Sequence, residues 1–421
     1  MNRPRLPIGT FSLSMQFRCW KLLVAFAALI TYANGQITED VLTRFAMRNV
    51  MGGLAIDANG IFYGAVSTYF QRGNVYKLRH LPDGRWVRTT LYSFTGGADG
   101  EQPKGNLILD QAGNLYGTTA WGGATGNGVV FELTPTVKVP WIEKVIYAFT
   151  SFPDGSGVSS GLIADAAGNF YGTTAFGGLG HGTVFRLKHN GDGTWTESVL
   201  YRFTGTTDGI GPSDGLAMDH AGKLLGTTRV GGAHNGGTLF ELSPGSNDTW
   251  TFRLLHAFCA RANCSDGQTP MGVALDSHGD IYGTTNAGGV VPCWAWDMGC
   301  GVVYKLTRSQ IGSLTFTVLH SFCLAASCLD GARPASSMTL DSAGNLYGTT
   351  IVGGNSNQGT AFKLSHPVGS PWILTPLYSF CALAQCADGL NPGGPLTIDG
   401  MGNLLGPAPG LIFELIPTQT P

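Results

Sequence analysis

The stretch Gly113-Asn114-Leu115-Tyr116-Gly117-Thr118-Thr119 decides the fold, because it returns along the whole chain. It recurs as Gly168-Asn169-Phe170-Tyr171-Gly172-Thr173-Thr174, and less complete copies keep its central glycine. The copies contain seven marker glycines: Gly64, Gly117, Gly172, Gly226, Gly283, Gly348 and Gly406. The intervals between them are 53, 55, 54, 57, 65 and 58 residues. Spacing this regular is typical of a repeat architecture, so we interpret the chain as one array of seven units.

Each unit contains four short apolar runs separated by turn residues. In the second unit the runs are Gly105–Asp110, Leu115–Thr119, Gly128–Leu133 and Trp141–Phe149. Runs this short and this evenly spaced predict an antiparallel meander. A four-stranded meander repeated around an axis is a β-propeller blade, and we name its strands A to D in chain order.

The two ends of the array indicate that the blades close into a ring. The seventh unit, Pro395 to Leu415, has only three runs, and a D-like segment, Val41–Phe45, stands alone near the N-terminus. Together they would complete the seventh blade and leave no exposed sheet edge. We therefore predict an all-β, seven-bladed propeller of four-stranded blades in residues 36–421. The six complete D runs end at Phe94, Phe149, Phe203, Phe258, Phe322 and Phe380.

Residues 1–35 are predicted to be a secretory signal peptide. Four basic residues precede a 12-residue apolar run from Leu22 to Ala33, and Ala33-Asn34-Gly35 supplies the small residues of a cleavage site. The run is short for a bilayer-spanning helix, so no membrane insertion is expected after cleavage. An uncleaved anchor helix is the alternative. The protein is expected to be secreted, periplasmic or attached to the cell surface.

The charge balance argues against a nucleic-acid partner. Residues 1–35 hold four basic and no acidic side chains, so the remaining chain has 21 basic and 27 acidic groups and a net charge of −6. A nucleic-acid-binding protein would present a basic face. We expect no nucleic-acid partner and a monomeric protein.

Eight cysteines outside the signal segment form four near-neighbour pairs, which predicts local disulfides in an exported chain. Zinc binding is the alternative, but the C-x4-C and C-x6-C spacings differ from those of zinc knuckles. The pairs are Cys259/Cys264, Cys293/Cys300, Cys323/Cys328 and Cys381/Cys386.

The recurring pattern Asn-Leu-Tyr-Gly-Thr-Thr-x-x-Gly-Gly, followed by Gly-x-x-Phe-x-Leu, resembles the GloVer tandem repeat of exported bacterial proteins. The resemblance covers nearly the whole chain after residue 35. It implies export and a propeller-like repeat fold, and it implies no reaction.

The repeat also helps to distinguish residues that are expected to be structural from candidate functional residues. In a meander the B–C and D–A loops share one face, which we call the loop face, and the A–B and C–D turns share the other. An active site needs one asymmetric constellation, so the repeated Asp, Asp-Gly and Thr-Thr residues are expected to be structural. As an alternative, the repeated aspartates offer the oxygen ligands that Ca²⁺ prefers, and no other cofactor is predicted.

Few chemically active residues remain once the repeats are set aside. Three carboxylates outside the repeat pattern, Glu101, Asp214 and Asp297, fall on the loop face, as do His181 and His234. A glycosidase-like carboxylate pair among them cannot be tested from spacing alone. No catalytic residue is assigned, and a non-enzyme is favoured.

The longest repeat interval contains the irregular segment 290–300, where a predicted disulfide would hold two tryptophans and an acid on the loop face. Exposed aromatic rings on a pre-organised loop suit sugar stacking or protein contact. Alternatively, the rings fold back to cover a blade. The predicted ligand-binding residues, two of them from neighbouring loops, are Trp294, Trp296, Asp297, Trp121 and Phe176.

The sequence therefore predicts an exported binding or scaffold propeller that engages a glycan, a peptide or a surface polymer through the loop face. One alternative is a propeller-type hydrolase or lyase acting on a polysaccharide, which requires a carboxylate pair or a His–carboxylate pair near the axis. Another is a purely structural envelope or matrix protein, which a flat, polar loop face would favour.

Overall fold

A computed structural model describes residues 37–45, 52–68, 71–289, 299–309 and 312–417. The chain divides into residues 39–416, which form the propeller, and the chain ends, residues 1–38 and 417–421. The predicted signal peptide lies outside the described residues. Within them, no helix has both the length and the apolar character needed to cross a membrane.

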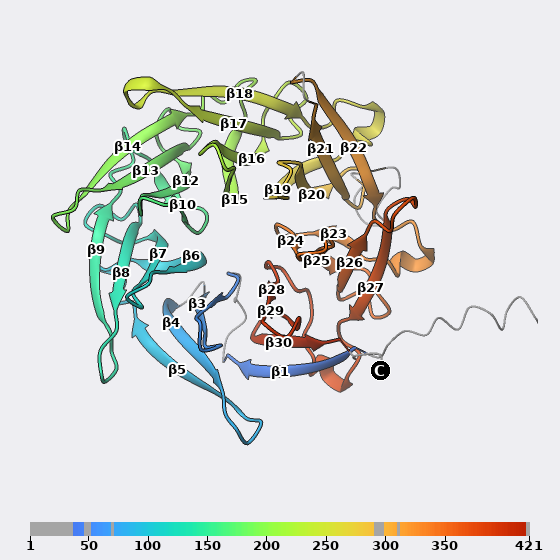
Figure 1. Ribbon diagram of the computed structural model, residues 1–421, viewed down its shortest axis with the longest axis horizontal. Coiled ribbons are helices and arrows are strands. Elements are labelled where there is room, and N and C mark those ends of the chain that lie inside the picture. Colours follow the sequence, from blue (N-terminus) through green and yellow to red (C-terminus); the bar gives the residue numbers. More distant parts are fainter. Residues whose placement is uncertain (1–36, 46–51, 69–70, 290–298, 310–311, 418–421) are drawn as a thin grey trace, which may run out of the picture. The chain divides into compact units, whose positions relative to one another are not determined.

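Seven antiparallel sheets surround a common axis, which confirms the predicted seven-bladed propeller (Figure 1). Blade 1 comprises β2 (Ala55–Ile56), β3 (Phe62–Thr68), β4 (Gln71–His80) and β5 (Trp86–Ser93). Blade 2 comprises β6 (Glu101–Leu109), β7 (Leu115–Trp121), β8 (Val129–Thr134) and β9 (Ile142–Ala148). Blade 3 comprises β10 (Ser156–Val158), β11 (Ile163–Ala164), β12 (Phe170–Phe176), β13 (Thr183–His189) and β14 (Trp195–Arg202). Blade 4 comprises β15 (Ile210–Met218), β16 (Leu224–Val230), β17 (Thr238–Pro244) and β18 (Trp250–Ala257).

The remaining blades repeat this plan. Blade 5 comprises β19 (Gln268–Leu275), β20 (Ile281–Ala287), β21 (Val302–Arg308) and β22 (Leu314–Ser321). Blade 6 comprises β23 (Ala332–Pro334), β24 (Thr339–Leu340), β25 (Leu346–Val352), β26 (Thr360–Ser365) and β27 (Ile373–Ser379). Blade 7 comprises β28 (Thr397–Ile398), β29 (Leu404–Ala408), β30 (Leu411–Ile416) and β1 (Thr38–Arg44).

Blade 7 closes the ring by joining the two ends of the array. Its strands are ordered β1-β30-β29-β28, so the N-terminal strand is the outer strand beside the last three. The N–H of Phe45 donates to the carbonyl oxygen of Gly410 at 2.7 Å, just beyond β1. The predicted seam of one strand plus three is therefore confirmed.

The marker glycine recurs because an aromatic ring of the next strand packs over it. In blade 2, a Cβ on Gly117 would lie 2.5 Å from Cζ of Phe131, closer than real carbon atoms approach. Phe131 is fully buried and contacts Phe94 of the preceding blade edge-on, with 5.0 Å between ring centroids. Burial of such large rings supplies much of the free energy that holds neighbouring blades together.

The A strand of blade 2 extends further toward the loop face than the sequence predicted. In blade 2 the A strand begins at Glu101 rather than Gly105, because Glu101 pairs with Trp121 before the register shifts at a bulge. The bulge arises where innermost strands meet at the axis. A Cβ on Gly105 would lie 1.8 Å from the backbone nitrogen of Gly161 in the next blade, so backbone there contacts backbone.

Candidate functional site

The aspartates that end the A strands are structural, as predicted. In each blade one carboxylate oxygen accepts hydrogen bonds of 2.8–3.0 Å from the backbone N–H groups two and four residues later. This pattern closes the A–B turn. The seven residues are Asp57, Asp110, Asp165, Asp219, Asp276, Asp341 and Asp399.

The aspartates of the D–A loops are also structural, because their carboxylates are hydrogen-bonded within the blade. Each lies 2.6–3.1 Å from a tyrosine hydroxyl or a histidine Nε2 of the D strand before it. Asp266, for example, also accepts from the backbone N–H groups of Ala260 and Arg261 at 3.1 Å. The full set is Asp99, Asp154, Asp208, Asp266, Asp330 and Asp388.

His256 and His320 belong to this repeated network. Their Nε2 atoms lie 3.0 Å from Asp266 and Asp330, where other blades place a tyrosine hydroxyl. Their side chains are only 15% and 17% exposed, so both imidazoles pack within the blade. These His–carboxylate pairs sit on outer strands, β18 and β22, not at the axis that the hydrolase hypothesis requires (Figure 1).

The paired threonines of the marker motif connect strands and blades. The first, Thr118, donates at 2.8 Å to the carbonyl oxygen of Ser160 in the next blade. The second, Thr119, donates to the carbonyl oxygen of Trp121 and accepts from the N–H of Val129. Both threonines are fully buried, so the structural interpretation is confirmed here and ligand contact is excluded.

Three of the four predicted disulfides lie in the described residues and are confirmed: Cys259–Cys264, Cys323–Cys328 and Cys381–Cys386. They close the D–A loops that follow blades 4, 5 and 6. In these loops the D-strand Tyr or His lies ten residues before its aspartate, against seven in loops without cysteines. Each disulfide therefore closes a loop that is three residues longer.

In the described part of the chain, a trio of buried cysteines comes close enough for a metal: Cys300, Cys323 and Cys328. All three are in disulfides and offer no thiolate ligand. The predicted partner of Cys300, Cys293, lies outside the described residues, as do Trp294, Trp296 and Asp297.

The non-repeat polar residues that the structure describes are spread over blades 2 to 4. Glu101 begins β6 in blade 2, whereas Asp214 is an exposed residue of β15 in blade 4. His181 is half-buried in the B–C loop of blade 3, and His234 is exposed in the B–C loop of blade 4. In the described part of the chain neither imidazole has a hydrogen-bond or ion-pair partner.

The loop face carries an arc of exposed apolar side chains over blades 2 to 4. Direct hydrogen bonds show that the B–C and D–A loops share this face, since the N–H of Gly123 donates to Gly97 at 2.9 Å. Trp121, Phe176 and Val230 end the B strands of three successive blades and are 39%, 54% and 40% exposed. Phe152 and Leu179, in the loops between, are 73% and 57% exposed. We call these five residues the apolar arc.

Trp121 and Phe176 border the same glycine, Gly157 of β10. A Cβ on Gly157 would lie 3.1 Å from Cδ2 of Phe176 and 3.8 Å from Cη2 of Trp121. The structure thus brings together the two predicted binding residues that it describes. Gly157 itself is buried beside the two rings, and we call the surface that Trp121 and Phe176 form at this glycine the Gly157 slot.

The sequence prediction missed Phe152, Leu179 and Val230. A signal for Val230 was present, because it stands four residues after its marker glycine, as Trp121 and Phe176 do. Beyond blade 4, Leu324, Leu329 and Leu383 in the D–A loops after blades 5 and 6 are also exposed, at 57%, 43% and 54%, but the described ends of the B strands there are not. At the same position Ala287 is buried and Val352 is only half-buried.

Three glutamates on outer strands have raised pKa values: Glu39 in β1, Glu143 in β9 and Glu197 in β14. Burial, and then the nearby carboxylate of a D–A aspartate, raises the pKa of each from 4.5 to about 7. The aspartates are Asp388, Asp99 and Asp154 in the same order. The Oε1 atoms of all three glutamates are buried and accept no hydrogen bond from the described residues.

Solved structures with the same architecture include two bacterial proteins. A catalytically inactive variant of virginiamycin B lyase from Staphylococcus aureus, solved with quinupristin, is 14% identical, with a TM-score of 0.53 over 90% of this chain and 98% of that chain. The extracellular domain of a one-component system from B. thetaiotaomicron is 11% identical, with a TM-score of 0.56 over 92% of this chain and 42% of that chain. At these identities the similarity establishes the fold alone.

Comparison with curated proteins gives no match. The profile of a repeat family, by contrast, matches nearly the whole propeller in three overlapping stretches, residues 30–213, 142–291 and 179–410. These stretches contain the marker glycines, the paired threonines and the D–A aspartates that build the blades. The chain therefore belongs to the Gloeobacter/Verrucomicrobia repeat family.

Proposed function

We propose that this protein is an exported glycan-binding propeller that holds a polysaccharide chain on its loop face. The observation that carries the proposal is the Gly157 slot, where two exposed aromatic rings from successive blades flank one glycine. Aromatic faces offer broad apolar contact at low conformational cost, which suits the C–H face of a sugar ring.

The surroundings of the slot favour a glycan over a purely apolar partner. Glu101 lies opposite Trp121 across the β6–β7 pair, and Gln102 follows it. Both are half-buried polar residues that can bond to sugar hydroxyls. A sugar polymer needs this combination of apolar platform and polar edge. The rest of the apolar arc extends the surface over three blades, which suits a chain of several sugar units.

Export is part of the proposal and rests on two features. The N-terminal 35 residues have the pattern of a signal peptide, and disulfides are typical of oxidising compartments.

The exposed apolar arc argues against the alternative of a purely structural protein, for which a flat, polar loop face is expected.

Glycan-array binding followed by titration of the tightest-binding oligosaccharide tests this function. The double variant Trp121→Ala/Phe176→Ala should weaken binding by about tenfold or more, because two stacking surfaces are removed. Ile142→Ala is the matched control, since Ile142 is 62% exposed but lies on outer strand β9. Binding to no glycan, or equal binding by the double variant, would refute the proposal.

A further inference from the structure

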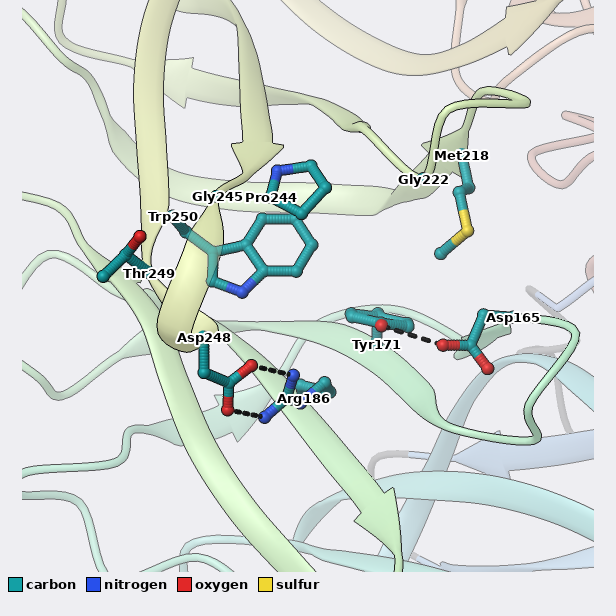
Figure 2. Close-up of a pocket in the computed structure, with 10 residues that line it drawn as sticks. All are labelled: Asp165, Tyr171, Arg186, Met218, Gly222, Pro244, Gly245, Asp248, Thr249 and Trp250. Carbon is teal, nitrogen blue, oxygen red and sulfur yellow. Dashed lines mark hydrogen bonds and ion pairs between the residues drawn. The ribbon is translucent and has the colours of Figure 1, made fainter.

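A cavity lies between blades 3 and 4 on the face opposite the loop face. It has a volume of about 190 Å³ and is bordered by the A–B and C–D turns of blade 4 (Figure 2). Residues Pro244 to Thr249, which form one wall, are exposed, so the cavity is open to solvent. Its volume is below the 300–1,000 Å³ of drug-sized sites, which limits a ligand to about one ring.

Arg186 of β13 gives the cavity its chemistry. It is nine-tenths buried, and its Nη1 and Nη2 donate to Oδ1 and Oδ2 of Asp248 at 2.5 and 2.6 Å (Figure 2). Its Nε is buried and has no acceptor within the described residues. Its burial keeps this N–H out of reach of a ligand, so the guanidinium acts through its two hydrogen bonds, which fix the Asp248 carboxylate at the edge of the cavity.

The arginine is specific to this blade. The C-strand residue opposite the marker-motif Tyr or Leu is charged in every blade, but it is lysine or glutamate in the other six: Lys77, Glu132, Glu241, Lys305, Lys363 and Glu414. Two of these lysines, Lys305 and Lys363, instead lie over tyrosine rings. A side chain that departs from the repeat is a better candidate for function than one that follows it.

The remaining walls are aromatic and apolar. Trp250 and Tyr171 meet edge-on with 6.0 Å between ring centroids, and Met218 lies across the opening from them (Figure 2). The Tyr171 hydroxyl is already bonded to Asp165 at 3.0 Å, so the tyrosine offers its ring rather than its hydroxyl. Trp250 supplies a flat surface for one face of a ligand.

The charges favour a neutral, hydroxylated ligand. Arg186 and Asp248 neutralise each other, so an anion would meet no net positive charge. The Asp248 side chain is 61% exposed and keeps lone pairs free for hydroxyl donors. We propose that the cavity is a binding site for a single pyranose ring. The ring stacks on Trp250 and donates hydrogen bonds to Asp248, which Arg186 holds in place.

Saturation-transfer NMR with four methyl pyranosides, of glucose, galactose, mannose and N-acetylglucosamine, tests this site on the full chain. At least one should bind. Arg186→Lys keeps the positive charge but cannot hold both oxygens of Asp248, and should weaken that binding by about tenfold. Met218→Trp fills the opening without touching the ion pair, and should abolish binding.

Two controls separate this site from other effects. Arg308→Lys makes the same change in the Arg308–Glu241 ion pair at the next blade interface and should leave the affinity unchanged. Trp121→Ala/Phe176→Ala removes the loop-face rings and should also leave this binding unchanged, so the two sites fail separately. Binding of none of the four glycosides, or binding unaltered in both Arg186→Lys and Met218→Trp, would overturn the proposal.

Discussion

The backbone N–H of Gly157 donates a 3.1 Å hydrogen bond to the carbonyl oxygen of Asn127 in the preceding blade. The next two blades repeat the bond, from Gly211 to His181 at 3.0 Å and from Thr269 to Gly236 at 2.8 Å. Each donor has a positive φ, 61°, 62° and 56°, so left-handed backbone recurs at the entry to successive blades. The three blades therefore share this backbone conformation, although the residue at this position differs between them.

Gly157 and Gly211 therefore form a matched pair for testing the slot. An alanine at either should cost about 1 kcal/mol of unfolding free energy, because both have left-handed φ values. Only at Gly157 would the new Cβ contact Phe176 and Trp121, whereas at Gly211 the nearest atom is the Ala175 oxygen at 3.9 Å. Gly157→Ala should weaken glycan binding and Gly211→Ala should not. Denaturant unfolding and titration check both effects, and equal binding by the two variants would argue against the slot.

Stability should fall as the pH rises from about 4.5 to about 7. In this range Glu39, Glu143 and Glu197 keep protons in the folded protein that the unfolded chain releases, because burial raises each folded pKa to about 7. The triple variant Glu39→Gln/Glu143→Gln/Glu197→Gln should have a flatter profile. Melting temperature measured against pH checks this. An equal slope in wild type and the triple variant would contradict the assignment.

Asp266 should matter for folding, while His256 should be replaceable by the residue of the other blades. Asp266→Ala leaves His256 and two loop N–H groups without an acceptor, which should cost roughly 2–4 kcal/mol of unfolding free energy. His256→Tyr restores the pairing seen between Tyr201 and Asp208 and should cost far less. Urea unfolding curves measure both. A His256→Tyr loss as large as that of Asp266→Ala would show that the two side chains are not interchangeable here.

The native protein should contain no reactive thiol among its paired cysteines. The three short disulfides close loops of the loop face, and Cys300 is also disulfide-bonded. Alkylation without reductant, followed by mass measurement of the protein after residue 35, should give no added mass. Two added groups per molecule would show that a pair, first of all Cys293/Cys300, is open.

The architecture could be predicted from the sequence because the same motif occurs once in each of the seven blades. Seven marker glycines gave the blade number, and the missing D run of the last unit located Val41–Phe45 in blade 7. The start of β6 was missed because Glu101–Lys104 has the composition of a loop, and only its pairing with β7 makes it a strand.

The candidate site was less accessible to sequence reasoning. Trp121 and Phe176 stood out as aromatics in the loops, but their shared contact with Gly157 depends on how two blades pack. The Arg186–Asp248 pair joins residues 62 positions apart and depends on a left-handed C–D turn, with Asp248 at φ 62°. Asn and Asp are enriched at positive φ, so Asn247-Asp248 was a signal for the turn, but the sequence does not show which residue of another blade the carboxylate reaches.

The measurement that tests glycan binding most directly is a crystal structure of the protein with the oligosaccharide that binds tightest in the array. We predict a sugar ring over Gly157, in contact with both Trp121 and Phe176. An oligosaccharide bound elsewhere on the propeller, without contact to Trp121 or Phe176, would contradict the proposed function.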